Sequence, residues 1–262
     1  MQQNTIKPFR VPAEKNELLQ QALTRINTNE EIQALWHVIN VNAIDRLGMS
    51  DHGPVHFQIV ANIALKLLRT LKKRGVVASV VKDFELTQDH AELIIVLASI
   101  MHDFGMSINR DGHEEFSLFL TNSLLREILD FLPIKERTIV VSETLHAIIN
   151  HRAGGRPITL EGGIVRVADA LDMTHGRSRI PFEAGKIDIY SLSAFAIDKV
   201  EIHEGKEKPL LIEIYMSNSA GVFQIDELLK SKLKDSGIEA FIEVIAYIEA
   251  ESEKKLIAEF KL

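Results

Sequence analysis

Cysteine is absent from this chain of 262 residues. Its absence excludes disulfide bonds and thiolate metal sites, and it is typical of proteins that work in a reducing cytoplasm. No apolar run reaches the roughly 18 residues that a membrane span needs. Residues 1–16 also lack the apolar segment of a signal peptide. The sequence therefore predicts a cytoplasmic protein without membrane contact.

Positively charged residues are fewer than negatively charged ones. The chain has 30 Lys and Arg and 37 Asp and Glu, which gives a net charge of −7. General nucleic-acid binding needs many cations to neutralise phosphates, so it is not expected. A small anionic phosphate substrate is compatible with an acidic chain if positive charge is concentrated locally, and a bound metal ion supplies such charge. With 46% apolar and 26% charged residues, the composition is that of a globular protein.

The apolar residues of the first 185 positions recur at helical spacing, without the alternation of a strand. The segment HAELIIVLASIMHD (90–103) is apolar on nearly every side, so its helix should lie at the centre of the domain. We expect a capping box of Thr28 and Glu31 to start the second helix, and Asp111 to cap a later one. The expected helices are 14–27, the segment around Trp36, 54–73, 90–103, 112–131, 134–151 and 159–174.

After Pro181 the pattern changes to the alternation of strands. The expected elements form a ββαββ unit, with strands at 197–203 and 209–216, a helix at 223–235 and strands at 242–249 and 255–262. We therefore predict a mainly α protein, in which an all-helical domain (1–185) precedes a small α+β C-terminal domain (186–262).

Three separated segments carry candidate metal ligands. His56 lies in the first turn of an expected helix, His102 and Asp103 end the apolar helix, and Asp169 lies among apolar residues of a later helix. Burying such side chains costs free energy, which a bound cation would offset by taking up the carboxylate charge and the imidazole lone pair. Nitrogen and oxygen ligands suit Mn²⁺, Fe²⁺, Mg²⁺, Ni²⁺ or Zn²⁺. Each residue alone could be a helix cap or an ion-pair partner, but the ordered set is more specific.

The order of these residues on successive helices resembles the HD superfamily of metal-dependent phosphohydrolases. IMHDFGM resembles the family's HD-[IL]-G segment, and IVRVADALD resembles its last motif. The resemblance covers roughly residues 50–180. It implies an HD-type helical domain in which His56, His102, Asp103 and Asp169 hold one divalent metal ion. It also implies hydrolysis of a phosphate ester, in a nucleotide or a related phosphomonoester or phosphodiester.

Further histidines leave a second ion open. His113, in GHEEFS, resembles an additional histidine of the HD-GYP phosphodiesterases and other binuclear members, and His151, in NHRAGGRP, resembles part of a later HD-GYP motif. By that resemblance Asp103 could bridge two ions, with His113 and either His146 or His151 completing the second site. His146 and His151 are five residues apart, about 140° around a helix, so only one of them is expected to point inward.

Departures from the HD-GYP pattern argue against cleavage of a cyclic dinucleotide. Asn150 stands where those proteins have the first His of a pair, and Arg152 replaces their Glu. Arg156 replaces their Tyr, and Met106 replaces their Lys.

Catalysis is expected to depend on Asp103, His113 and two arginines. Arg177 and Arg179 follow the last ligand helix, and their planar donors match phosphate oxygens, so we predict that they bind the substrate phosphate. A protonated His113 would protonate the leaving oxygen. The alternative is a catalytically silent HD domain that senses a nucleotide or metal and reports through residues 190–262. Homo-oligomerisation through this C-terminal unit and a purely structural role for it are both open.

Overall fold

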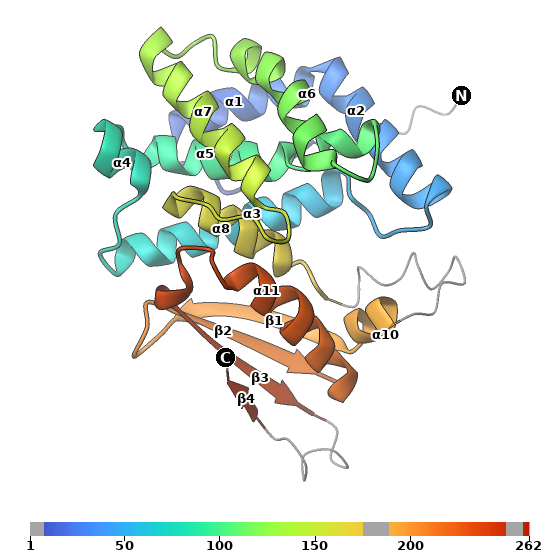
Figure 1. Ribbon diagram of the computed structural model, residues 1–262. Coiled ribbons are helices and arrows are strands. Elements are labelled where there is room, and N and C mark those ends of the chain that lie inside the picture. Colours follow the sequence, from blue (N-terminus) through green and yellow to red (C-terminus); the bar gives the residue numbers. More distant parts are fainter. Residues whose placement is uncertain (1–7, 175–188, 250–258, 262) are drawn as a thin grey trace.

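The computed structural model describes residues 8–174, 189–249 and 259–261. In Figure 1 the helices α1 to α8 form one body, and a sheet with two further helices lies along one side of it. The helical body consists of α1 (Glu17–Thr28), α2 (Glu30–Asn40), α3 (Pro54–Lys73), α4 (Ser79–Phe84), α5 (Gln88–Met101), α6 (His113–Ile128), α7 (Ile134–Asn150) and α8 (Leu160–Ala170).

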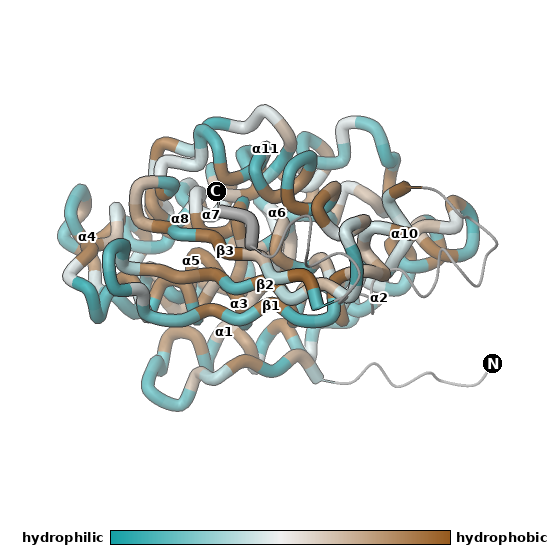
Figure 2. Tube along the Cα trace, turned by 90° about the horizontal axis from the view of Figure 1, so that it is seen from below, coloured by the Kyte–Doolittle hydropathy of each residue, from teal (hydrophilic) through white to brown (hydrophobic). Residues whose placement is uncertain are grey.

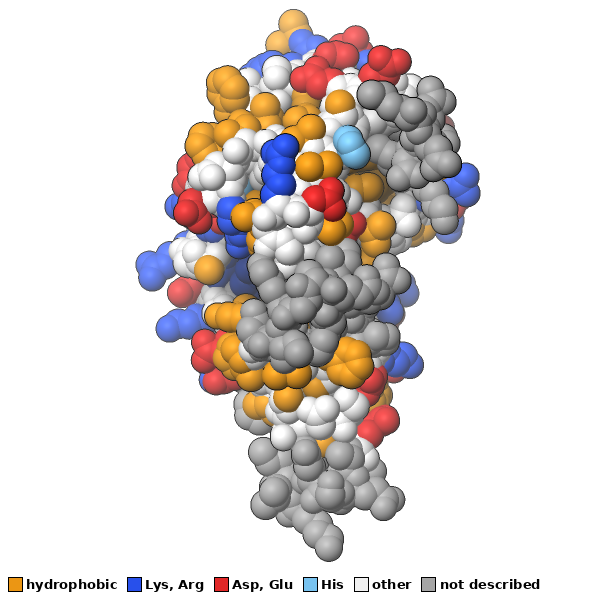
Figure 3. Space-filling view, turned by 90° about the vertical axis from the view of Figure 1, so that its right-hand side faces the viewer, with side chains coloured by type: hydrophobic (Ala, Val, Ile, Leu, Met, Phe, Trp, Pro, Cys, Tyr) orange, Lys and Arg blue, Asp and Glu red, His pale blue; other side chains and the backbone are white. Residues whose placement is uncertain are grey.

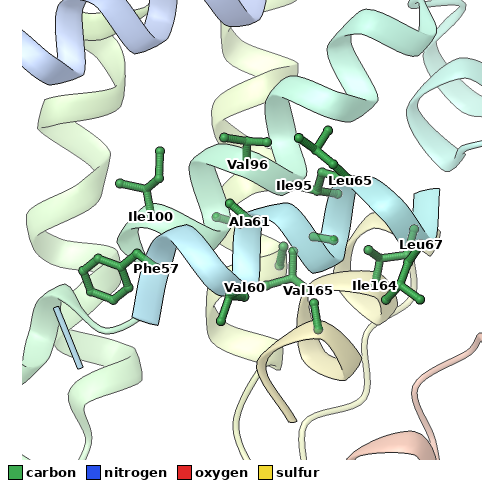
Figure 4. Packing of buried hydrophobic residues seen from close by; sticks show 14 of the residues in the cluster. Phe57, Val60, Ala61, Leu65, Leu67, Ile95, Val96, Ile100, Ile164 and Val165 are labelled. Atoms are coloured by element: carbon green, nitrogen blue, oxygen red, sulfur yellow. The ribbon is translucent and has the colours of Figure 1, made fainter. Parts of the chain in front are cut away.

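Helix α5 is the centre of this body, as its apolar sequence predicts. Every residue from His90 to Met101 is buried, because α1, α3, α7 and α8 all pack against the helix. Figure 4 shows one part of this packing, where Phe57 of α3 lies near Ile100 of α5, and Leu65 of α3 lies near Ile95 and Val96 of α5. Burying an aliphatic or aromatic side chain of this size contributes about 1.5–3 kcal/mol, so the helices that carry the candidate ligands rest on a stable core.

The first turn after α5 is shaped by Gly105. A Cβ atom built on this glycine would lie 1.9 Å from the carbonyl oxygen of His113, which no real side chain tolerates. The backbone of Gly105 therefore lies directly against the start of α6, and its N–H donates to Ser117 Oγ at 2.8 Å. This close approach holds the α5 end and the α6 start together.

Several expected helix boundaries are wrong. The N-cap of α2 is Asn29, whose side chain accepts from the N–H of Ile32, so the Thr28 capping box does not form. Helix α6 is preceded by Gly112 in the left-handed conformation (φ +73°), with no side-chain cap from Asp111. The short helices α4 and α10 (Ile189–Phe195) were not expected, because they have too few residues to show a period.

The C-terminal unit is a four-stranded sheet in the order β1-β2-β3-β4. Pairs β1–β2 and β3–β4 are antiparallel, while β2–β3 is parallel, because the chain crosses over through η5 and α11. The elements are β1 (Ile197–Glu204), β2 (Leu210–Met216), η5 (Gln224–Leu229), α11 (Lys230–Leu233), β3 (Ile242–Ile248) and β4 (Glu259–Lys261). The predicted mainly α class with a small ββαββ unit is confirmed.

One face of this sheet is buried. Alternate residues of β2 and β3 point to that face and belong to the same hydrophobic cluster as the core of the helical body: Leu210, Ile212, Ile214, Met216, Ile242, Val244, Ala246 and Ile248. Figure 2 shows hydrophobic residues along the sheet and the helices behind it. The two units therefore share one continuous core.

Helix α8 is also held to the C-terminal unit by polar contacts. The buried guanidinium of Arg166 donates to the carbonyl oxygens of Lys232 at 2.7 Å and Ser231 at 3.0 Å. Nearby, Gly163 lies so close to the backbone of Ser236 that a Cβ there would be 2.3 Å from its carbonyl oxygen. The first contact fixes the position of α11 relative to α8, and the second fixes the segment that follows α11.

The surface shown in Figure 3 carries Lys and Arg side chains interspersed with Asp, Glu and hydrophobic ones. Within the described residues, no helix has the length and hydropathy required to cross a membrane. The domain boundary expected after residue 185 falls within residues 175–188, outside the described ranges, and it stays a prediction.

Candidate metal centre

His56 is held at the start of α3 by local features of the sequence. Pro54 occupies the first turn of the helix, where its missing N–H has no cost. The carboxylate of Asp51 accepts hydrogen bonds from the N–H groups of Gly53 at 2.9 Å and His56 at 3.3 Å. The imidazole of His56 is consequently fixed on the inner side of the first turn, where it is 2% exposed.

The other three expected ligands come from α5 and α8. His102 and Asp103 follow directly after the last residue of α5 and are 0% and 4% exposed. Asp169 lies in the last turn of α8, with a side chain that is 13% exposed. Because α3, α5 and α8 pack against one another, the three helices bring all four side chains to one place.

The distances between these side chains suit one ion. His56 Nε2 lies 3.1 Å from His102 Nε2 and 3.3 Å from Asp169 Oδ1. His102 Nε2 lies 3.5 Å from Asp103 Oδ2 and 3.8 Å from Asp169 Oδ1. Ligand atoms about 2.1 Å from a common ion are about 3.0–3.4 Å apart in octahedral or tetrahedral geometry. The donor atoms are therefore close to the spacing that a small divalent cation requires.

Three of the site histidines present the same nitrogen to the centre. Nδ1 of His56, His102 and His151 faces a group that can only accept, so in the neutral ring Nδ1 carries the proton and Nε2 keeps its lone pair. The Nδ1 partners are Asp172 Oδ2 for His56 at 2.6 Å, Ser99 O for His102 at 3.0 Å and Ile148 O for His151 at 2.6 Å. Nδ1 of His113 lies 2.9 Å from both the carbonyl oxygen and Nη1 of Arg110, an acceptor and a donor. With both rings neutral, the Nε2 lone pairs of His56 and His102 face each other at 3.1 Å. A cation bound beside both nitrogens turns this repulsive contact into a favourable one.

The protonation states also favour metal binding. Burial lowers the pKa of His102 to about 3, so its imidazole is neutral near pH 7. Burial alone would raise the pKa of Asp103, but His102 and His113 outweigh it and hold that pKa well below its usual range. Burial is likewise outweighed at Asp169, where the ammonium of Lys232 lowers the pKa most. Neutral imidazoles and ionised carboxylates are the forms that bind metal ions.

Asp103 divides its two carboxylate oxygens between two groups of histidines. Its Oδ2 lies 3.5 Å from His102 Nε2 and 3.9 Å from His56 Nε2. Its Oδ1 lies 3.0 Å from His113 Nε2 and 3.6 Å from His151 Nε2. This is the arrangement of a carboxylate that can bridge two ions.

Of the two alternatives, His146 on α7 and His151 directly after it, the structure brings only His151 to the site. Its donor atom lies within 4.8 Å of those of His102 and Asp103. His146 faces the loop before α8 instead, where its Nε2 accepts from the N–H of Ile158 at 3.1 Å. The lone pair of His146 is therefore used in holding that loop.

Two other arginines near the site, Arg152 and Arg156, lie beside acidic side chains. Arg152 pairs with Glu115 at 2.5 Å, and Arg156 lies 3.9 Å from Asp235 with its side chain 80% exposed. Arg177 and Arg179 lie outside the described residues, so their predicted contact with phosphate stays a prediction.

Two residues of the site were missed by the sequence analysis. Asp172 accepts from His56 and thereby fixes its ring, and its spacing of three residues after Asp169 could have indicated this. Lys232 forms an ion pair with Asp169 Oδ2. No sequence pattern indicated Lys232, because it lies 63 residues away in a different unit.

A cavity of about 630 Å³ opens over the donor set, and both units line it. The helical body contributes Asp103, Asp169 and His52, whose Nδ1 lies 2.7 Å from Ser50 O. The C-terminal unit contributes Tyr190, Gln224 and Lys232, among others. The cavity is large enough for a small organic phosphate.

Comparisons with known proteins agree with this geometry. The family model of the HD domain matches residues 55–174, which include every described candidate ligand. An uncharacterized protein of Methanocaldococcus jannaschii is 42% identical over 224 residues, which is 85% of this chain and 86% of that protein. A match of this length must include part of the C-terminal unit. No solved structure matches the chain. The chain therefore belongs to the HD family, whose helical domains bind divalent metals and are generally metal-dependent phosphohydrolases.

Proposed function

We propose that this protein hydrolyses a small phosphate ester, in a nucleotide or a related organic phosphate, with the help of a divalent ion held by His56, His102, Asp103 and Asp169. The observation that carries this proposal is the contact of 3.1 Å between two Nε2 lone pairs inside a buried set of carboxylates. A cation bound beside both nitrogens makes this contact favourable, and the carboxylates of Asp103 and Asp169 next to them are suitable further ligands.

A divalent ion bound there supplies Lewis acidity toward a phosphoryl oxygen and lowers the pKa of water. The residues of the chain orient this chemistry. Asp172 holds the ring of His56, and the carbonyl of Ser99 holds that of His102, so both present Nε2. Burial on the inner side excludes bulk water and strengthens the electrostatic interactions at the site.

His113 can act either as a proton donor or as a metal ligand, and the number of metal ions bound per chain distinguishes these two roles. Burial lowers its pKa most, but the hydrogen bond and charge of Asp103, together with the charge of Glu114, outweigh burial and raise that pKa above its usual value. A protonated His113 can donate to the leaving oxygen when one ion is bound. With two ions per chain, His113 and His151 would hold the second, and Asp103 would be shared between the two sites.

The proposal is tested by metal analysis of the purified protein and by turnover of a panel of phosphate esters with Mn²⁺. We expect near-stoichiometric metal and hydrolysis of at least one ester. Asp103→Asn should reduce that hydrolysis more than tenfold, whereas Asp111→Asn, at an exposed position in the next loop, should leave it unchanged. Bound metal without turnover of any ester would instead favour a sensor that binds a nucleotide or metal without catalysis.

A further inference from the structure

Lys232 brings a positive charge from the C-terminal unit to the metal centre. Its ammonium pairs with Oδ2 of Asp169, while Oδ1 of the same carboxylate faces His56 and His102. The side chain is 19% exposed, and it lines the cavity over the donor set. The ammonium can therefore keep its contact with Asp169 while it also faces the space where a substrate would lie.

The position of Lys232 is built into the fold. Arg166 is 1% exposed and donates to the carbonyl oxygens of Ser231 and Lys232 themselves. Arg166 and Asp169 lie on the same helix, three residues apart. Helix α8 thus positions both the carboxylate and the backbone from which the ammonium extends.

The other cations of the cavity are engaged elsewhere. Arg152 pairs with Glu115, and Arg110 Nη1 lies 2.9 Å from His113 Nδ1. The cavity lining also contains several carboxylates, including Glu114. Within the described residues, Lys232 is the lysine or arginine that forms an ion pair with one of the four expected metal ligands. An anionic substrate needs such a cation to offset repulsion from the carboxylates.

We propose that Lys232 binds the phosphate group of the substrate, with its ammonium shared between Asp169 Oδ2 and a non-bridging phosphate oxygen. Lysine acts on phosphate as a point charge with three donors, so one contact with Asp169 leaves donors for the anion. The inference rests on the proposed function. It makes the C-terminal unit part of the substrate site.

The test compares Lys232→Met, which removes the charge and keeps most of the stem, with Lys230→Met as the matched control. Lys230 lies on the same helix but is 56% exposed and pairs with Asp226. Binding of inorganic phosphate to the metal-loaded protein is measured by calorimetry, together with KM for a hydrolysed ester and metal content. We expect Lys232→Met to weaken phosphate binding and raise KM at least tenfold, with metal content unchanged. Lys230→Met should match the wild type, and Lys232→Arg should recover part of the loss.

Unchanged phosphate affinity in folded Lys232→Met would overturn the proposal. Loss of metal in this variant would also overturn it, because Lys232 would then only position Asp169. If Lys232→Met does not fold, Lys232→Gln is measured in the same way. Failure of the proposed function can be distinguished from failure of this inference. If the proposed function is wrong, the wild type hydrolyses no ester. The phosphate titration does not depend on hydrolysis and still tests Lys232.

Discussion

The two nitrogens of His56 have different partners, and this difference determines how the side chain can act. Nδ1 lies 2.6 Å from Asp172 Oδ2, and Nε2 faces the donor set. A carboxylate that accepts from a ligand histidine fixes the tautomer and the ring orientation and makes the imidazole more basic. Asp172 should therefore contribute to metal affinity although His56 separates it from the ion.

Replacing Asp172 with Asn should lower the affinity for Mn²⁺ or Zn²⁺ by roughly tenfold to a hundredfold, with the helical content unchanged. Competition with a chelator measures this affinity. Asp130→Asn is the control, because Asp130 is 58% exposed and pairs with Arg25, and neither residue lines the cavity over the donor set. Equal metal affinity in Asp172→Asn and the wild type would show that the contact with His56 is not needed.

The stability of the metal-free protein should depend on pH through His102. In the unfolded chain its pKa is about 6.5, whereas burial lowers it to about 3 in the folded chain. Between these values the unfolded state binds a proton that the folded state does not, so stability falls as the pH falls from about 6.5 toward 3. Asp103 and Asp169 act in the same direction at lower pH, because their depressed pKa values favour the folded state only while they are ionised.

Urea unfolding in the presence of a chelator, at several pH values from 7.5 downward, measures this dependence. One proton contributes a slope of at most about 1.4 kcal/mol per pH unit. His102→Gln should show a shallower decrease between pH 6.5 and 4.5 than the wild type. An identical slope in both proteins would assign the acid sensitivity to other groups.

Individual site residues could be predicted from the sequence where a metal-binding residue type also occurs in the expected order along the chain. His56 was chosen at the start of a helix, His102 and Asp103 at the end of an apolar one and Asp169 within another, and the structure places these four residues together. The choice between His146 and His151 could not be made, because a helical angle gives their separation but not the direction of the site. Asp172 was missed because it follows the helix end, whereas the expected helix continued to about residue 174.

Among the elements, α5 was easy to predict and the shortest helices were not. A helix that is apolar on all sides must be central, and α5 is. Helix α4 contains six residues and α10 seven, which is too short for a helical period to show. The start of α2 was misplaced by one residue because Asn29 competes with Thr28 as N-cap, and both residue types are favoured there.

Gly105→Ala should destabilise the fold by about 1–3 kcal/mol, since the new methyl group would collide with the carbonyl of His113. The shift should also weaken any metal site that uses His113. Chemical denaturation and metal titration measure the two effects. Gly75→Ala is a milder comparison, because nothing lies within 4 Å of its Cβ position and only its φ of +81° is unfavourable. If Gly105→Ala lowers the free energy of unfolding no more than Gly75→Ala does, the contact between the end of α5 and the start of α6 can adjust to an added methyl group.

For the whole molecule, the main question is how firmly the two units are joined. They share one hydrophobic cluster, and Arg166 connects α8 to the backbone of α11. The sequence predicted two units but not this junction, because carbonyl groups that accept from an arginine leave no pattern in the side chains. Homo-oligomerisation through the C-terminal unit stays a prediction.

Arg166→Met should reduce the free energy of unfolding by about 2–3 kcal/mol, because the buried guanidinium loses its partly buried hydrogen bonds to the carbonyl groups of Ser231 and Lys232. Arg156→Met, at an 80% exposed side chain, should change stability by less than about 0.5 kcal/mol. If the first variant also binds inorganic phosphate weakly, the position of α11 matters for the site. Equal stability of the two variants would show that hydrophobic contacts alone join the units.

The ion pair between Asp169 and Lys232 spans 63 residues, and this has a consequence for the order of events during synthesis. Chains emerge from the ribosome with the N-terminus first, and domains tend to fold as they appear. All the described candidate ligands precede residue 170, so a nascent chain can complete its donor set and capture an ion before Lys232 has been translated. Strand β3, which pairs in parallel with β2, arrives later still. The chain could then bind a metal ion during synthesis, whereas it could bind phosphate through Lys232 only after synthesis is complete.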